Sequence, residues 1–146
     1  MLVSIVIPCY NSEHTIGKVV ELAIEEFSKM KDYECEFVLV NDFSRAGTWK
    51  SIQELTARHS NVKGINLAKN FGQHNAIMAG LNYTEGDLIL GMDDDMQNHP
   101  SQIPQFLDKI QEGYDIVFGV FKERKFSAFK NLTGAVSRFL LWHLLD

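Results

Sequence analysis

The chain has 146 residues, of which 45% are hydrophobic and 23% are charged, and its formal net charge is −5. This length and balance are typical of one globular domain and exclude a disordered chain, while the acidic balance argues against a general nucleic-acid-binding protein. No apolar run approaches the roughly 18 to 20 residues of a membrane span, and no signal peptide is expected, so we expect this stretch to be soluble. With two cysteines, Cys9 and Cys35, a disulfide scaffold is excluded and a reducing cytoplasm is the default.

Strand-like and helix-like patterns alternate along the chain. Leu2–Pro8 is an apolar, β-branched run that stops at a proline, which predicts a buried strand. Apolar residues recur at helical spacing in 13–30, which predicts a helix with Ser12 as its N-cap. The same patterns then predict, in chain order, strand 37–40, helix 48–59 with Thr48 as a cap, strand 62–67, helix 73–83, strand 87–92, helix 103–110, strand 115–119 and helix 127–145.

Alternating helices and nearly continuous apolar strands indicate an α/β fold, with a mostly parallel sheet and helices on both faces. In open sheets of this kind, ligands bind at the carboxyl ends of the strands. Polar clusters follow four of the predicted strands, at 8–13, 41–44, 69–73 and 93–97. We therefore expect these four segments to meet at one edge of the sheet.

Three consecutive aspartates, Asp93, Asp94 and Asp95, are the strongest chemical signal in the sequence. Adjacent carboxylates repel one another unless a cation neutralises them. Alternate residues of an extended turn point the same way, so Asp93 and Asp95 can converge while Asp94 points elsewhere. Such a pair suits Mg²⁺ or Mn²⁺, which leave coordination positions open for a substrate diphosphate. The competing interpretation is a solvated acidic turn that caps the next helix.

Residues at the other strand ends have both a functional and a structural interpretation. Asp42 is placed to accept a hydrogen bond from a base or ribose, or to cap a turn. Tyr10 is placed to stack on a base, or to be a half-buried core residue. Asn70 and Gly72 can form a loop that lets the backbone approach a ligand, or an ordinary glycine turn. The residues alone leave these alternatives open.

Four motifs in this order resemble the family 2 glycosyltransferases. They are IVIPCYNSE, VLVNDFS, NFGQHNAIMAGL and GDLILGMDDDMQNHPSQIPQFL, and the resemblance extends over essentially the whole chain. The combination of 70–73 with 95–97 and 103–104 is most similar to one branch of the family. That branch moves a sugar from a nucleotide donor to a polyprenyl phosphate, as dolichol-phosphate mannosyltransferase and its bacterial undecaprenyl relatives do.

The resemblance implies a Rossmann-like GT-A fold and an inverting, metal-dependent transfer of sugar from a UDP- or GDP-sugar. The implied acceptor is a polyprenyl phosphate in cell-envelope glycan synthesis, with a saccharide hydroxyl as the alternative. The implied donor-binding residues are Pro8, Tyr10, Glu13, Asn41, Asp42, Asn70, Asp94 and Arg124. The implied ligands of Mg²⁺ or Mn²⁺ are Asp93, Asp95 and Gln97.

The sequence also departs from the family pattern. Phe43 stands where the family often has Gly, and Ala46 stands where it has a second Asp, so we expect changed turn and cap chemistry there. Lys69 stands where Arg is frequent. Family members continue well beyond residue 146. We therefore expect residues 1–146 to be one truncated GT-A catalytic domain, the donor-binding half, with the catalytic base downstream.

The end of the chain differs in charge from the rest. Residues 122–146 carry five Lys or Arg against two Asp or Glu, a net charge of +3, whereas residues 1–121 carry nine against 17, a net charge of −8. A basic amphipathic helix at 127–145 fits a membrane surface, or else it packs on the sheet. In full-length form we expect a peripheral or membrane-anchored protein on the cytoplasmic side.

Rival activities fit the motifs less well. A sugar nucleotidyltransferase would need a Gly-rich basic loop after the first strand, which 8–11 lacks. An aspartyl-phosphate phosphotransferase would need a Thr soon after the aspartates, which 96–97 lacks. A non-catalytic nucleotide-sugar-binding fragment stays open.

Overall fold

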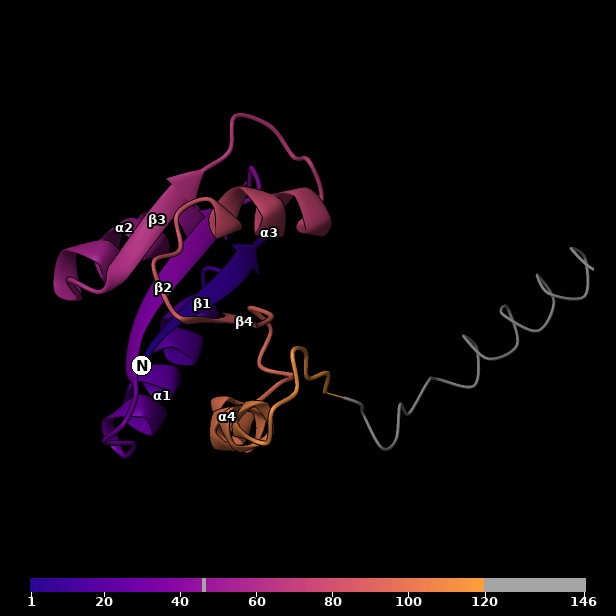
Figure 1. Cartoon of the computed structure of the whole chain (residues 1–146). Helices are drawn as coiled ribbons and strands as arrows, with labels where there is room; N and C mark the ends of the chain where they lie inside the picture. Colours follow the sequence, from indigo (N-terminus) through magenta and orange to yellow (C-terminus); the bar gives the residue numbers. More distant parts are fainter. Residues whose placement is uncertain (46, 120–146) are drawn as a thin grey trace, which may run out of the picture. The chain divides into compact units, whose positions relative to one another are not determined.

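The computed structural model describes residues 1–45 and 47–119 (Figure 1). The chain divides into two units, Met1–Tyr114 and Asp115–Asp146, and the sheet with its helices belongs to the first. The strands are β1 (Leu2–Cys9), β2 (Glu34–Asn41), β3 (Val62–Asn66) and β4 (Leu88–Gly91). The helices are α1 (Ile16–Ser28), α2 (Thr48–Arg58), α3 (Gln73–Leu81) and α4 (Ile103–Gln111), and the 3₁₀ turn η1 (Pro100–Gln102) leads into α4.

The four strands form one sheet in the order β3-β2-β1-β4, and every neighbouring pair is parallel. The first three strands are added outward in one direction from β1. The chain then returns through α3 and places β4 on the opposite side of β1 (Figure 1). The strand order therefore reverses between β1 and β4, which is where open α/β sheets form a crevice for ligands.

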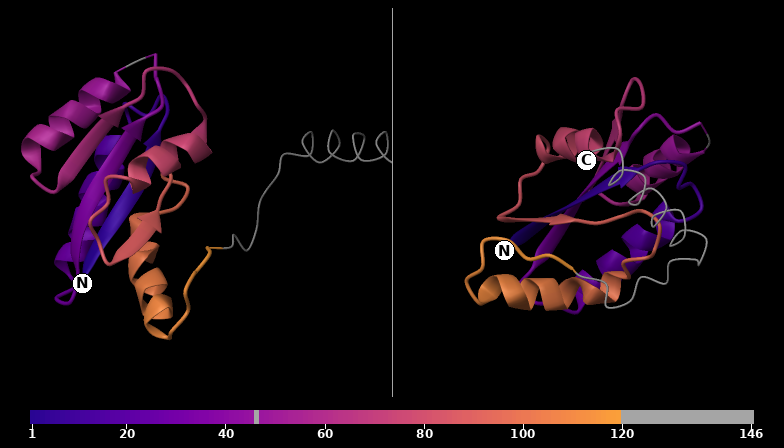
Figure 2. Two further views of the ribbon diagram at one scale, coloured as in Figure 1. Left: turned by 45° about the horizontal axis from the view of Figure 1, so that its top comes forward. Right: turned by 90° about the vertical axis from the view of Figure 1, so that its right-hand side faces the viewer.

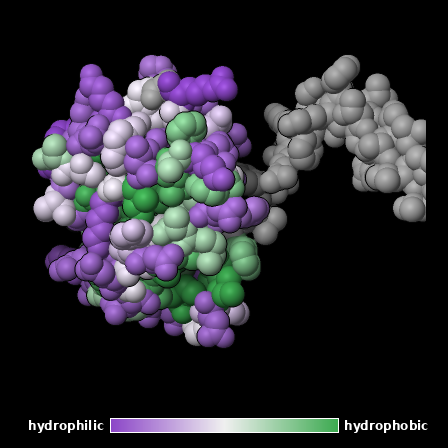
Figure 3. Space-filling model, turned by 90° about the horizontal axis from the view of Figure 1, so that it is seen from above, coloured by the Kyte–Doolittle hydropathy of each residue, from purple (hydrophilic) through white to green (hydrophobic). Residues whose placement is uncertain are grey.

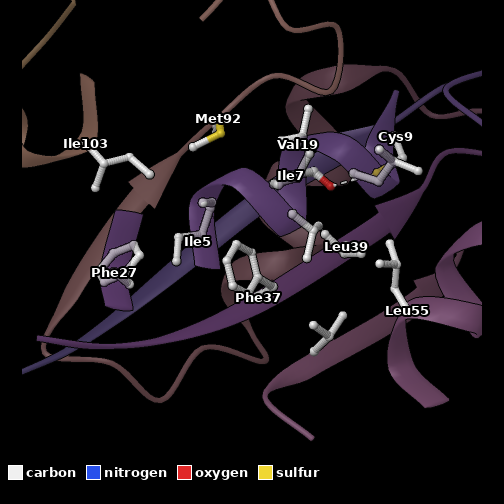
Figure 4. Packing of buried hydrophobic residues seen from close by; sticks show 14 of the residues in the cluster. Ile5, Ile7, Cys9, Val19, Phe27, Phe37, Leu39, Leu55, Met92 and Ile103 are labelled. Carbon is white, nitrogen blue, oxygen red and sulfur yellow. Dashed lines mark hydrogen bonds between the residues drawn. The ribbon is translucent and has the colours of Figure 1, made fainter. Parts of the chain in front are cut away.

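Both faces of the sheet are covered, because side chains alternate along each strand. Ile5 and Ile7 of β1 belong to a core shared with α1, α2 and α4, part of which Figure 4 shows. Val6, between them, belongs to a second core with Ala76 of α3. The helices thus lie on both sides of the sheet, as two further views make plain (Figure 2). The predicted arrangement of a parallel sheet with helices on both faces is confirmed.

The backbone of α3 lies unusually close to the sheet at Gly80. A Cβ atom there would lie 2.6 Å from Val6 Cγ1 and 3.0 Å from Val40 Cγ2. Since real Cβ atoms do not approach other carbons this closely, only glycine allows the observed packing. This contact fixes the position of α3, whose first residue, Gln73, lies at the carboxyl edge of the sheet.

Both predicted helix caps are wrong. Thr15, not Ser12, precedes α1, and the buried Ser12 hydroxyl has no hydrogen-bond partner within the described part of the chain. Thr48 is the first residue of α2 and does not cap it. Its hydroxyl accepts from the Ser12 N–H at 2.9 Å and donates to Glu13 Oε2 at 3.2 Å. At Thr48, a tertiary contact between the start of α2 and the loop before α1 has taken the place of local capping.

The strand predicted at 115–119 is also wrong. These residues adopt no regular structure, and Ile116 and Phe118 are 68% and 81% exposed. An apolar run alone does not make a strand, because the main-chain groups of a strand need the partners that a neighbouring strand supplies. The helix predicted at 127–145 lies outside the described residues. Within them, no helix has the length and apolar character needed to cross a membrane.

Candidate functional site

A cleft of about 390 Å³ opens at the carboxyl edge of the sheet, where β1 and β4 end. This volume is typical of small-molecule sites. Figure 3 looks down on the molecule from the top of Figure 1, toward which the strands β1 to β3 run, and shows hydrophilic and hydrophobic residues intermixed. The lining residues are Pro8, Cys9, Tyr10, Asp42, Asn70, Gly72, Gln73, Asp93, Asp94 and Asp95. All four polar segments contribute to this list, so the expectation that they meet is confirmed.

The charged residues that line the cleft are all acidic. Among its lining residues, which all belong to the described part of the chain, are four aspartates and no Lys or Arg. An anionic ligand would be repelled by such a lining. The lining therefore favours either a cation or an anion that arrives together with a cation.

Asp42 connects the end of β2 to the loop that precedes α3. Its carboxylate is 3% exposed, and its two oxygens accept the N–H groups of Phe71 and Gly72 at 2.7 and 2.8 Å. Asn70 Oδ1 also accepts the Gly72 N–H, at 3.1 Å. Gly72 has φ +85°, in the left-handed region that favours glycine. Asp42 thus shapes the 70–72 turn at the cleft wall, and its contact with a base stays a prediction.

The three adjacent aspartates each have different partners. Asp93 accepts two side-chain amides, from Gln73 Nε2 at 2.9 Å and from Asn98 Nδ2 at 3.1 Å. Asp94 Oδ2 accepts the main-chain N–H of Tyr10 at 2.9 Å. The Asp94 carboxylate is therefore directed toward the end of β1, unlike that of Asp93, and its hydrogen bond joins the end of β1 to the turn after β4.

Asp95 completes the acidic run. Its Oδ1 accepts the main-chain N–H of Gln97 at 2.9 Å, within its own turn. Met96, between them, has φ +65°, a backbone conformation that L-residues seldom adopt. A local hydrogen bond thus stabilises the conformation of the turn after β4. Both Asp93 and Asp95 line the cleft.

The donor set fits a hard divalent cation that shares its coordination with a ligand. No three His, Cys, Asp or Glu side chains among residues 1–45 and 47–119 are grouped so as to hold a metal by themselves. Mg²⁺ and related ions commonly bind one or two carboxylates and take their other ligands from water and substrate phosphates. Asp93 and Asp95 supply two carboxylates, and each oxygen that accepts one N–H retains a further lone pair.

Three predicted site residues lie outside the cleft lining. Glu13 accepts the hydroxyl of Thr48, and the Asn41 amide donates to Asn66 Oδ1 at 2.7 Å. Gln97 contributes its main-chain N–H to Asp95. These residues brace the turns around the cleft, and direct contact of any of them with a ligand stays a prediction.

Some predicted residues cannot be placed. Arg124 lies outside the described residues, as does Ala46, which marks one departure from the family pattern. Phe43, another departure, has φ +55°, so a glycine is indeed the residue that this turn favours.

Two cleft residues, Cys9 and Gln73, lie in the predicted polar segments, but sequence reasoning assigned no role to their side chains. Cys9 is fully buried, and burial together with the charge of Asp94 raises the pKa of its thiol far above the usual range. Cys9 is therefore a neutral packing residue and not a nucleophile. Gln73 is the first residue of α3, directly after a polar strand-end segment, and that placement was the available signal.

Comparison with known proteins decides the family. The family model for glycosyl transferase family 2 matches residues 4–136, which is most of the chain. This chain belongs to glycosyl transferase family 2. The predicted family is thereby confirmed.

Curated relatives of this family 2 chain include two undecaprenyl-phosphate 4-deoxy-4-formamido-L-arabinose transferases. The enzyme of Shewanella sediminis is 43% identical over 130 residues, and that of Proteus mirabilis is 40% identical over 129 residues. Each alignment covers 88% of this chain but only 39% of the relative. The likeness agrees with the predicted resemblance to the polyprenyl-phosphate branch, and the chain spans well under half the length of these relatives.

Solved structures confirm the predicted GT-A fold. A mannosyltransferase from Pyrobaculum calidifontis, in complex with GDP-Man and Mn²⁺, superposes on this chain with a TM-score of 0.60 at 20% identity. The match covers 72% of this chain and 31% of the mannosyltransferase. Staphylococcus aureus TarS 1-349, in complex with UDP-GlcNAc, gives a TM-score of 0.57 at 22% identity. The match covers 84% of this chain and 39% of the TarS chain. At these identities the likeness is one of fold.

Proposed function

We propose that this chain is the donor-binding part of an inverting glycosyltransferase that moves a sugar from a UDP- or GDP-sugar to a polyprenyl phosphate. The observation that carries the proposal is the cleft at the β1/β4 crevice, with four aspartates and no Lys or Arg in its described lining. A sugar nucleotide is a polyanion, so this lining favours binding it together with a cation. The named function of the curated relatives supports the choice of acceptor.

Asp93 and Asp95 are the residues that would bind Mg²⁺ or Mn²⁺, and Gln97 is the proposed third ligand. When bound, the ion supplies charge stabilisation for the departing nucleoside diphosphate. The Mn²⁺ in the Pyrobaculum calidifontis complex supports this choice of ion.

The remaining cleft residues are proposed to orient the nucleoside. Tyr10 is 52% exposed at the end of β1, so its ring is available for stacking on a base. Pro8, Asn70 and Asp42 line the same cleft, and Asp94 joins the ends of β1 and β4 through the Tyr10 N–H. We assign Glu13 and Asn41 to bracing the surrounding turns and Arg124 to the donor phosphates.

A phosphate acceptor needs little general-base catalysis from the residues of this chain. A phosphate acceptor is ionised near neutral pH, so its oxygen attacks the anomeric carbon with less help from a base than a sugar hydroxyl needs. We propose that the acceptor-side groups and any catalytic base lie outside residues 1–146, and that the full-length protein works at the cytoplasmic face of a membrane.

The donor proposal is tested by calorimetric titration of UDP and GDP into the chain with Mn²⁺, with Mg²⁺ and with EDTA. We expect one nucleotide to bind with the metal and to lose at least tenfold in affinity in EDTA. Asp93→Asn should lose the metal-dependent binding. Asp108→Asn is the matched control, because it makes the same change on the exposed side of α4. Equal nucleotide binding with and without metal would contradict the proposal.

The acceptor is tested separately, with the full-length protein and a labelled donor sugar. Transfer to undecaprenyl phosphate but not to a free saccharide would support the proposed acceptor. Transfer only to a saccharide hydroxyl would instead identify the other acceptor class within the same family. Donor binding with no transfer to either acceptor would indicate a binding module.

A further inference from the structure

We propose that Gln73 and Asn98 are positioning residues that orient the Asp93 carboxylate toward the cation in the cleft. This inference rests on the proposed function, since it concerns the same site. Gln73 Nε2 donates to Asp93 Oδ1 at 2.9 Å, and Asn98 Nδ2 donates to Asp93 Oδ2 at 3.1 Å. The two amides come from different segments of the chain, one from the start of α3 and one from the turn before η1.

Two donors on two different oxygens restrain the rotation of the carboxylate. A single hydrogen bond would leave the group free to turn about its last side-chain bond, whereas two bonds define its plane. Each oxygen keeps one more lone pair for a metal ion. Outer partners of this kind commonly change metal affinity by about 10- to 100-fold when they are removed.

Asp93 differs from its neighbours in how it is held. Asp94 and Asp95 each accept a main-chain N–H, from Tyr10 and Gln97, which every residue except proline provides. The partners of Asp93 are side chains, so its orientation depends on the identity of residues 73 and 98. This dependence makes the role of both amides accessible to mutation.

Gln73 is itself in a fixed position. The main-chain N–H groups of the preceding residues, Phe71 and Gly72, bind the buried Asp42 carboxylate. Farther along the helix, Gly80 lets α3 pack directly on Val6 and Val40. The helix is thus anchored near both ends, which fixes where its first residue, Gln73, lies relative to the sheet.

The test compares Gln73→Met and Asn98→Leu with the unchanged chain. Both substitutions retain approximate side-chain size and remove the amide. Calorimetry would measure Mn²⁺ affinity in the presence of the nucleotide that binds, and thermal melting without ligand would measure folding. We expect each variant to bind Mn²⁺ about tenfold more weakly, while its melting temperature and its metal-free nucleotide affinity stay unchanged. Gln53→Met is the matched control, because residue 53 is an exposed Gln of α2 outside the cleft.

A second measurement separates positioning from general disturbance. Gln73 and Asn98 hold the same carboxylate, so the loss of Mn²⁺ affinity in the double variant Gln73→Met/Asn98→Leu should differ from the sum of the two single losses, whereas two unrelated disturbances would add. Equal Mn²⁺ affinity of Gln73→Met, Asn98→Leu and the unchanged chain would overturn the inference alone. An unchanged chain that binds nucleotide without any metal dependence would overturn the proposed function and this inference with it.

Discussion

Three residues at the carboxyl edge of the sheet have left-handed backbone conformations without being glycine. Asn11 and Phe43 have φ +55° and Met96 has φ +65°, and each lies in a turn that follows a strand. Such conformations cost about 1–2 kcal/mol for a residue with a Cβ. Unfavourable backbone conformations tend to concentrate at functional sites, and in this protein they concentrate around the cleft.

Phe43 offers a test of this cost. Its side chain is 53% exposed, so the ring contributes little buried apolar area. We expect Phe43→Gly to raise the free energy of unfolding by up to about 1 kcal/mol, because glycine adopts positive φ without steric conflict. Urea denaturation would measure the change. Phe43→Ala is the control, since it removes the ring and keeps the Cβ. A glycine variant no more stable than the alanine variant would contradict the prediction.

Among the helices and strands, the placement of α3 matters most for the cleft. We expect Gly80→Ala to lower the free energy of unfolding by about 1–3 kcal/mol, because the added Cβ would overlap Val6 and Val40. It should also weaken Mn²⁺ binding by moving Gln73 away from Asp93. Gly17→Ala is the control: its Cβ would meet nothing within 4 Å. That variant should gain up to about 1 kcal/mol in α1, and chemical denaturation would compare the two.

A buried polar network joins β1, β2 and the turn before β4. Glu36 is 6% exposed and accepts the Ser4 hydroxyl at 2.5 Å, the Glu85 N–H at 2.6 Å and the Lys63 ammonium at 2.9 Å. Burial raises the pKa of Glu36, but these three hydrogen bonds and the Lys63 charge outweigh burial, so its pKa lies below the usual value. The pKa of Lys63 is raised in turn, by Glu85 first and then by Glu36.

This network predicts how stability depends on pH. Because the folded-state pKa of Glu36 is lowered, its contribution is fully present above the unfolded-state pKa of about 4.3. It is lost as the pH falls through the folded-state value. Glu36→Gln should therefore cost about 1–3 kcal/mol at pH 7, and its difference from the unchanged chain should shrink below about pH 4. Denaturation at both pH values is the measurement. Glu34→Gln, at the exposed start of the same strand, should be neutral.

At the scale of the whole molecule, the acidic cleft couples ligand binding to stability. Repulsion among Asp42, Asp93, Asp94 and Asp95 opposes folding, and a bound cation removes that repulsion. Mn²⁺ with the matching nucleotide at 100 times the dissociation constant should add about 2.7 kcal/mol to the free energy of unfolding. A thermal melt should show a rise that EDTA abolishes. A melting temperature that is indifferent to Mn²⁺, nucleotide and EDTA alike would contradict this coupling.

The sequence by itself determined the element types, the parallel α/β class and the family. Apolar runs such as Ile5–Ile7 are too hydrophobic for a half-exposed strand, so they require cover on both faces, and helical spacing in the intervening segments supplies that cover. The ends of the strands could also be predicted from the sequence, because polar residues such as 93–95 follow directly where an apolar run stops. The strand predicted at 115–119 has an apolar pattern but adopts no regular structure, because an apolar pattern does not by itself supply the neighbour that a strand needs.

Only the tertiary structure decided which polar groups hold one another. The partners of Asp42 are 29 and 30 residues away, and Gln73 is 20 residues from Asp93. No local pattern encodes such pairs, because they depend on β4 lying next to β1 and on α3 packing at Gly80. The same dependence explains the failed cap at Thr48. The Thr48 hydroxyl binds the Ser12 N–H and Glu13, which the folded chain brings next to the start of α2, instead of capping its own helix.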